Sequence, residues 1–289
     1  MVDGPIRQPR ADVEPAYRGR IAPTPTGFLH LGHYRTFRTA WERARAAGGS
    51  LVFRMEDIDP SRCRAQFAQA AMDDLRWAGL DWDEGPDVGG PCEPYEQSRR
   101  VSTFRAAFGR LQKIGAVFPC NCSRRDVAMA ATAPHAEDAE PVYSGACRAR
   151  SAVSVTEAMS WRFRVPQGAK VSFTDGRMGA QTFVSGRDFG DFIVWRRDDA
   201  PAYELAVVVD DAAMQITEIV RGADLLLSTA RQLLLYRALE LAPPRFHHCP
   251  LVTDSRGARL AKRHDSLSLR QLRARGVLPD ELPEAGFCL

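Results

Sequence analysis

The sequence predicts an α/β domain with a parallel sheet that is interrupted by an insertion. Short apolar runs alternate with stretches in which apolar residues recur at helical spacing, as in strands joined by crossover helices. The composition of the sequence changes after Val117, because cysteines and small residues cluster from there to about residue 190. With 289 residues, the chain can form one large domain with an insertion, or two domains.

The predicted elements alternate along the chain. The first part holds a strand that runs into a loop over 18–24, a helix around 37–44 ended by Gly48 and Gly49, a buried strand at 51–55, and helices around 67–78 and 104–111. The insertion includes a β-like piece at 161–165. The α/β pattern then resumes with a buried strand at 205–209 and a long helix around 227–238, which Pro243 and Pro244 end.

Composition excludes several classes of protein. Apolar residues make up 45% and charged residues 26%, ordinary values for a soluble globular protein. No run approaches the roughly 18 apolar residues of a membrane span, so no membrane partner is expected. Segment 1–16 lacks an apolar signal region and is expected to be a flexible tail of a monomeric, cytoplasmic protein. The odd count of 7 cysteines favours reduced thiols or a metal site over disulfides.

Positive charge is concentrated near the C-terminus. The net charge of +3 is too small to indicate nucleic-acid binding by itself. Between Arg256 and Arg275, however, seven basic residues face a single acid, Asp265. This stretch is either a surface that contacts phosphates or, as composition alone favours, a solvated helix face.

Segment 22–33 follows the first predicted strand and precedes the first predicted helix. Two prolines and a glycine make the loop stiff, and the helix N-terminus offers backbone N–H groups to an anion. His30 and His33 lie three residues apart, so both rings can point the same way and donate to a phosphate. Gly32 leaves room for a flat base. The alternative is a pair of structural histidines.

The string from Arg20 to His33 resembles the HIGH signature of class I aminoacyl-tRNA synthetases, in the longer form found in glutamyl-specific members. This resemblance implies a Rossmann-type catalytic domain. It also implies that His30, Gly32 and His33 bind ATP, with the two histidines acting in catalysis.

A second string far downstream, at 259–263, resembles the mobile KMSKS loop of the same class. Lys262 matches the lysine that binds the ATP phosphates, so the resemblance implies an ATP-binding and catalytic role for it. A cation on a flexible loop neutralises charge as pyrophosphate leaves. Arg259 and Ala261 stand where lysine and serine are usual, and both changes could weaken phosphate contacts.

A glutamate pocket needs arginines for two carboxylates and an acid for the ammonium group. Segment 53–62 resembles the family's RIED string, which implies that Glu56 meets the ammonium group. The strings around Tyr203 and Arg221 resemble the segments that bind the side-chain carboxylate. Without the family, these residues read as a solvated acid, a core tyrosine and a salt-bridged arginine. The implied glutamate-binding set is Arg20, Ile21, Ala22, Pro23, Thr24, Glu56, Tyr203 and Arg221.

The insertion carries three cysteines, Cys120, Cys122 and Cys147, which leave one position open around a tetrahedral zinc ion. Composition alone favours His135 as the fourth ligand. The pattern of the cysteines followed by Y-x3-C resembles the zinc site of glutamyl-queuosine synthetases, which implies Tyr143 instead. Three buried free thiols are the remaining alternative. A single zinc ion with four protein ligands would be structural.

The resemblance implies a catalytic domain at 17–117 and 191–255, a zinc-bearing insertion at 118–190, and a KMSKS-like loop with a short helical tail at 256–289. This build lacks an anticodon-binding domain and is similar to the glutamyl-queuosine tRNA(Asp) synthetase family. The implied activity is tRNA-independent activation of L-glutamate by ATP and Mg²⁺, then transfer to queuosine at the wobble position of tRNA(Asp). The rivals are a truncated glutamyl-tRNA synthetase acting on the tRNA 3′ end, a non-catalytic zinc-containing RNA-binding module, and another adenylate-forming nucleotidyltransferase.

Overall fold

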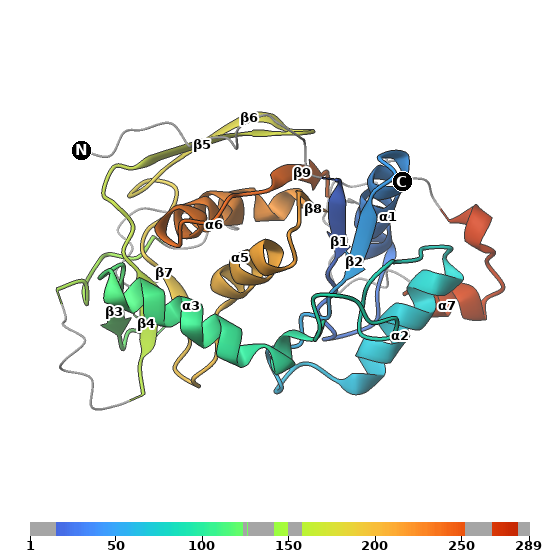
Figure 1. Ribbon diagram of the computed structural model, residues 1–289, viewed down its shortest axis with the longest axis horizontal. Coiled ribbons are helices and arrows are strands. Elements are labelled where there is room, and N and C mark those ends of the chain that lie inside the picture. The colour runs from blue at the N-terminus through green and yellow to red at the C-terminus, as the bar shows by residue number, and fades with distance from the viewer. Residues whose placement is uncertain (1–15, 124–125, 127–141, 150–157, 252–267, 283–289) are drawn as a thin grey trace.

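The computed structural model describes residues 16–123, 126, 142–149, 158–251 and 268–282. Strands and helices alternate in the first part of the chain, as the sequence predicts (Figure 1). Their bounds are β1 Arg18–Ile21, α1 Leu31–Ala46, β2 Ser50–Phe53, α2 Ala65–Trp77 and α3 Val101–Lys113. Strands β1 and β2 pair in parallel, with α1 as the crossover between them. The predicted strand that runs into a loop within 18–24, the predicted strand at 51–55 and the three predicted helices are therefore confirmed.

A second parallel pair completes the α/β core. The elements of this part are α5 Tyr203–Ala213, β8 Glu218–Gly222, α6 Leu226–Ala238, β9 Arg245–Cys249 and α7 Leu269–Ala274. Strands β8 and β9 are parallel. Directly before β8, the backbone N–H of Thr217 donates to the carbonyl of Arg18 at 2.8 Å, so the two parallel pairs lie side by side. The predicted parallel core is confirmed.

One predicted element is wrong. Segment 205–209, expected to be a buried strand, lies within helix α5. The helix occupies the middle of the molecule, and Leu205 to Val208 are all at most 1% exposed. A helix buried on every side has no polar face, so its apolar run cannot be distinguished by periodicity from a buried strand. Tyr203, expected before a strand, is therefore the first residue of a helix.

The strands between Val117 and Trp195, a range that includes the predicted insertion at 118–190, pair antiparallel. These strands are β3 Val117–Cys120, β4 Ser160–Phe163, β5 Lys170–Asp175, β6 Gly179–Val184 and β7 Phe192–Trp195. They form a β3-β4-β7 sheet and a separate β5-β6 hairpin. The β-like piece predicted at 161–165 is β4. In Figure 1 the hairpin runs along the top of the molecule, above α6. Its turn contacts the core where the N–H of Gly176 donates to the carbonyl of Phe246 on β9 at 2.8 Å.

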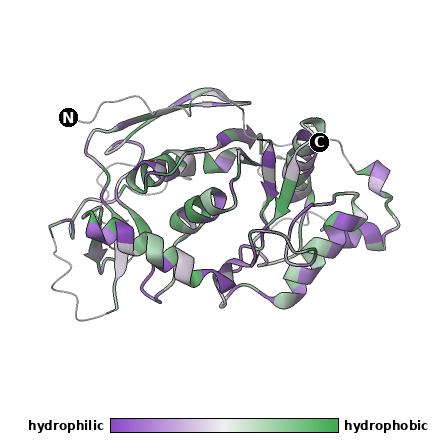
Figure 2. Ribbon diagram, in the orientation of Figure 1, coloured by the Kyte–Doolittle hydropathy of each residue, from purple (hydrophilic) through white to green (hydrophobic). Residues whose placement is uncertain are grey.

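The interior contains two main apolar clusters. One lies among β1, β2, α1 and α2, and the other joins α3, α5, α6 and the strands beside them. Figure 2 shows hydrophobic residues gathered on α5 and β2, whereas α7 is largely hydrophilic. Within the described ranges, no helix is long and apolar enough to cross a membrane.

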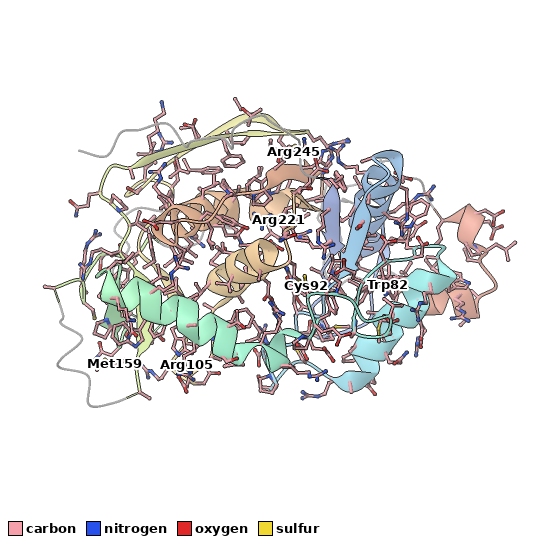
Figure 3. The ribbon with its side chains drawn as sticks, viewed as in Figure 1. Trp82, Cys92, Arg105, Met159, Arg221 and Arg245 are labelled. Atoms are coloured by element: carbon pink, nitrogen blue, oxygen red, sulfur yellow. The ribbon has the colours of Figure 1, made fainter. Side chains whose placement is uncertain are left out.

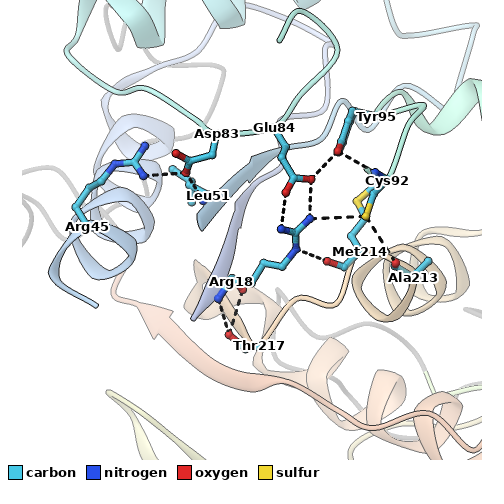
Figure 4. A network of polar contacts seen from close by, with 10 residues as sticks. All are labelled: Arg18, Arg45, Leu51, Asp83, Glu84, Cys92, Tyr95, Ala213, Met214 and Thr217. Atoms are coloured by element: carbon cyan, nitrogen blue, oxygen red, sulfur yellow. Dashed lines mark hydrogen bonds and ion pairs between the residues drawn. The ribbon is translucent and has the colours of Figure 1, made fainter. Parts of the chain in front are cut away.

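Strand β1 is anchored by a network around Arg18 (Figure 4). The guanidinium donates to both carboxylate oxygens of Glu84, at 2.5 and 2.6 Å, and to the carbonyl of Met214. Glu84 also accepts from the hydroxyl of Tyr95 at 2.5 Å. The network joins β1 to the segment before α3 and to the end of α5. It therefore fixes the strand from which the next functional segments emerge.

Candidate active site

A cavity of about 1090 Å³ opens where β1, β2 and β8 end. Ligands of open α/β sheets bind at this carboxyl edge. Ten residues predicted from the sequence line the cavity: Arg20, Ala22, Pro23, Thr24, His30, Gly32, His33, Glu56, Tyr203 and Arg221. Ile21 does not, because its side chain is fully buried in the apolar core. Lys262, Arg259, Ala261, His135 and the segment 1–15 lie outside the described residues.

The two histidines cap helix α1. The Nδ1 atom of His30 accepts from the N–H of Gly32 at 3.1 Å, and the Nδ1 atom of His33 accepts from the N–H of His30 at 3.3 Å. An accepting Nδ1 carries no proton, so each neutral ring is protonated on Nε2. The ring centroids are 3.8 Å apart. The cap thus orients two neighbouring imidazoles as Nε2 donors at the cavity.

This capping occupies one of the backbone donors at the start of α1. The sequence suggests that backbone N–H groups at the start of α1 receive an anion, but the Gly32 N–H is already bonded to His30. The Gly32 N–H is therefore not available to a phosphate while this bond is formed, and the Nε2 atoms of the two imidazoles are further donors beside it.

Arg20 lines the cavity from the end of β1. Its side chain is 5% exposed, and Nη1 donates to the carbonyl of Val220 on β8 at 2.7 Å. Its Nε atom lies 3.7 Å from a carboxylate oxygen of Asp211. Buried arginines held in this way keep their charge and have little conformational freedom. The guanidinium is a fixed cation in the wall of the cavity.

Glu56 is held by an arginine that sequence reasoning did not assign to the site. Arg54 is fully buried and donates to Asp211 at 2.6 Å and to Glu56 at 3.0 Å. Burial raises the pKa of Glu56, although the charges of Arg54 and Arg20 oppose this effect. Acidic residues that directly follow an apolar run, Asp210 and Asp211, are the only sequence signal for such a buried ion-pair cluster.

Arg221 lies in the interior near the middle of the molecule (Figure 3) and is 4% exposed. Its Nε donates to Nε2 of His248 at 3.1 Å, and its Nη2 donates to the hydroxyl of Thr229 at 2.7 Å. Its Nη1 is buried and has no hydrogen-bond partner among the described residues. A buried cationic donor left in this state carries a large desolvation cost unless a ligand supplies an acceptor.

Tyr203 contributes a hydroxyl to the same cavity. It is the first residue of α5, and 40% of its surface is exposed. Burial by the surrounding pocket walls raises its pKa to about 12. The phenol therefore stays protonated at neutral pH and can donate a hydrogen bond to a carboxylate.

The predicted metal ligands converge within the insertion. The sulfur atoms of Cys120, Cys122 and Cys147 all lie within 4.8 Å of one another. The hydroxyl of Tyr143 lies 3.5 Å from the sulfur of Cys120 and 3.9 Å from that of Cys122. It also accepts from the backbone N–H of Cys147 at 2.8 Å, which turns the oxygen toward the thiols. Three sulfurs and one oxygen in this arrangement can hold a metal ion.

Comparison with known proteins agrees with this architecture. Residues 16–285 match the family model for the catalytic domain of class I tRNA synthetases (E and Q). A glutamyl-Q tRNA(Asp) synthetase from Nitratidesulfovibrio vulgaris is 49% identical over 90% of this chain and 82% of its own length. One from Symbiobacterium thermophilum is 50% identical over 91% of this chain and 83% of its own length.

The likeness extends to solved structures. A crystal structure of a glutamate tRNA ligase from Elizabethkingia meningosepticum, in complex with its amino acid, matches with a TM-score of 0.75 and 27% identity. The match covers 91% of this chain and 53% of the ligase. The chain belongs to the class I tRNA synthetase family that comprises the glutamate and glutamine enzymes.

Proposed function

We propose that this chain activates L-glutamate with ATP without needing tRNA, and then transfers the glutamate to queuosine at the wobble position of tRNA(Asp). Two relatives at 49% and 50% identity are named glutamyl-Q tRNA(Asp) synthetase. The observation that carries the substrate assignment is the buried Nη1 of Arg221, a cationic donor without a partner among the described residues, on a side chain that lines the cavity. We expect a monomer that acts in the cytoplasm.

Glutamate fits the charges of the cavity. The side-chain carboxylate accepts from Nη1 of Arg221 and from the hydroxyl of Tyr203, which are both donors. Hydrogen bonds between a carboxylate and a guanidinium are the strong, charge-assisted kind. The carboxylate of Glu56 pairs with the ammonium group. Arg20 adds a fixed positive charge that favours the anionic substrate over the neutral amide of glutamine.

Activation is a displacement at phosphorus. The α-carboxylate of glutamate attacks the α-phosphorus of ATP in line, a bond forms between carboxylate oxygen and phosphorus, and pyrophosphate leaves with its electron pair. The product is glutamyl-adenylate. His30 and His33 donate from Nε2 to phosphate oxygens as negative charge develops there. Positioning and charge stabilisation carry this reaction, and no protein nucleophile takes part.

Two further contributions complete the reaction. Lys262, on the KMSKS-like segment, would neutralise the leaving pyrophosphate, and Mg²⁺ bound with ATP supplies positive charge to the phosphates. In the second step a hydroxyl of queuosine attacks the activated carbonyl and AMP leaves.

Zinc is proposed for the cysteine cluster. Cys120, Cys122, Tyr143 and Cys147 would hold the ion as four protein ligands. Such a closed site leaves no position for a water molecule, so the ion would stabilise the insertion and take no part in the chemistry.

The activation step is tested by glutamate-dependent exchange of pyrophosphate into ATP with no tRNA present. Glutamine and aspartate serve as controls. Exchange with glutamate alone is the expected result. If folded, zinc-loaded protein gives no exchange, tRNA-independent activation is wrong, and a tRNA-requiring synthetase or an RNA-binding module takes its place.

A further inference from the structure

A chain of three side chains leads from the hairpin of the insertion to the glutamate pocket. Asp175 ends β5, His248 lies on β9 and Arg221 lies on β8. The Nδ1 atom of His248 is 2.6 Å from a carboxylate oxygen of Asp175, and its Nε2 atom accepts from Nε of Arg221 at 3.1 Å. The side chains of His248 and Asp175 are fully buried, so water does not compete for these contacts.

The contacts determine the tautomer and the charge of His248. Because Nε2 accepts from a guanidinium, which has no lone pair to offer, the ring proton must be on Nδ1 and is donated to Asp175. Burial, followed by the charge of Arg221, lowers the pKa of His248 to about 4, although Asp175 opposes the shift. The imidazole is therefore neutral at pH 7 and meets Arg221 as a neutral acceptor.

Asp175 is itself firmly held. Its carboxylate accepts from the backbone N–H groups of Arg177 at 3.0 Å and of Met178 at 2.8 Å, both in the hairpin turn. It also accepts from the backbone N–H of His248 at 3.2 Å. These bonds fix the carboxylate relative to β9, so the imidazole cannot rotate without losing its partner.

We propose that the Asp175–His248 pair positions Arg221 and thereby sets the preference of the pocket for a carboxylate over an amide. This inference rests on the proposed function of the cavity. Among the described residues, Arg221 bonds only to neutral groups, the imidazole of His248 and the hydroxyl of Thr229. Its orientation is fixed while its charge stays uncompensated by a directly bonded carboxylate. An acidic residue at position 248 would orient the guanidinium equally well but would compete with the substrate.

The alternative is that the three residues only attach the hairpin to the core. That contact already has a separate backbone component, between Gly176 and Phe246. A purely structural role predicts that changes at His248 affect stability and leave amino-acid selectivity unchanged. A positioning role predicts that the affinity for glutamate falls while the affinity for glutamine does not.

Two substitutions at His248 separate these roles, because each keeps one half of the imidazole. His248→Asn places an amide N–H near the position of Nδ1, so it keeps the bond to Asp175 and removes the acceptor for Arg221. His248→Gln places an amide oxygen near the position of Nε2, so it keeps the acceptor and removes the donor to Asp175. Ser172→Ala, which removes an exposed hydroxyl contact across the hairpin to Thr182, is the control.

Binding of L-glutamate and L-glutamine is measured by calorimetry, and the KM for ATP by pyrophosphate exchange. For His248→Asn we expect glutamate affinity to fall roughly ten- to hundredfold, the range of one hydrogen bond to a charged group. Glutamine affinity and the KM for ATP should change less than about threefold. His248→Gln should retain most of the glutamate affinity, and Ser172→Ala should match the wild type.

The inference is overturned if folded His248→Asn binds glutamate as the wild type does, or loses glutamate and glutamine affinity equally. It is also overturned if His248→Gln is as impaired as His248→Asn. A wild-type protein that binds no glutamate sinks the proposed function itself, and this inference with it. Near-ultraviolet circular dichroism establishes that each variant is folded.

Discussion

Replacing Arg54 with methionine tests how strongly the buried ion pairs of Arg54 stabilise the structure around Glu56. The guanidinium is fully buried and donates to Asp211 at 2.6 Å and to Glu56 at 3.0 Å. Methionine has a comparable length but cannot donate, so the buried carboxylates of Glu56 and Asp211 lose a hydrogen-bonded charge partner, and Asp210 loses a positive charge 3.9 Å away. Removing one member of a buried ion pair costs about 3–5 kcal/mol. We apply this range once to the whole cluster, because the lost pairs all share Arg54 and their energies are not additive.

The measurement is equilibrium unfolding in urea, followed by tryptophan fluorescence. The matched control is Arg38→Met, which breaks the partly exposed pair between Arg38 and Glu42 on α1, together with a hydrogen bond from Arg38 to the hydroxyl of Tyr34. A surface pair of this kind contributes about 0–1 kcal/mol. If the unfolding free energy of Arg54→Met lies within about 1 kcal/mol of that of the control, the view that the ion pairs of Arg54 stabilise the structure around Glu56 is refuted.

The stability that Arg54→Met loses should depend on pH in a predictable direction. Burial already raises the pKa of Glu56 above its ordinary value of 4.5, and Arg54 is the largest influence opposing that rise. Without Arg54 the pKa of Glu56 in the folded state is higher still. A group whose pKa is raised by folding adds stability at low pH and loses it as pH rises through the folded value. The loss of unfolding free energy in Arg54→Met, relative to the wild type, should therefore be smaller at pH 5 than at pH 8.

Three further predictions concern the chemistry. Arg221→Ala should raise the KM for glutamate in pyrophosphate exchange by roughly 30-fold or more, the cost of truncating a buried charge partner, with little change in the KM for ATP; equal changes in both would contradict the assignment. His33→Asn keeps an acceptor for the cap but loses the Nε2 donor, so kcat should fall about 10²- to 10³-fold while thermal stability holds. Elemental analysis should find one zinc ion per chain in the wild type and none in Cys147→Ser, whose unfolding temperature should also be lower. Retention of one zinc ion per chain by the variant would rule out this ligand set.

Local sequence patterns predicted the backbone that carries His30 and His33, whereas their roles came from the family resemblance and stay predictions. The segment from Arg20 to His33 has a stiff loop followed by a helix, and the structure places both histidines at the start of α1. The spacing of Cys120, Cys122 and Cys147 likewise predicted a cluster that the structure brings together. In these cases the residues concerned are close in sequence or belong to one compact motif.

The parts that sequence reasoning missed depend on distant neighbours. Arg54 and Asp211 are 157 residues apart, and Asp175 and His248 are 73 apart. No local pattern indicates that such residues meet. The strand predicted at 205–209 is wrong for a related reason: its valines favour a strand locally, but the segment is a helix packed against α3, α6 and β7. The structure of α5 is decided by the elements that pack around it, and the local sequence does not indicate them.

The most direct test of the proposed activity identifies the acceptor. Radiolabelled glutamate and ATP are incubated with the enzyme and three separate acceptors: tRNA(Asp) carrying queuosine, the same tRNA lacking it, and tRNA(Glu). We predict label on the first alone, retained when the 3′ terminal adenosine is removed. Label on tRNA(Glu) that is lost with the 3′ adenosine would contradict this prediction and identify a synthetase that charges the tRNA end.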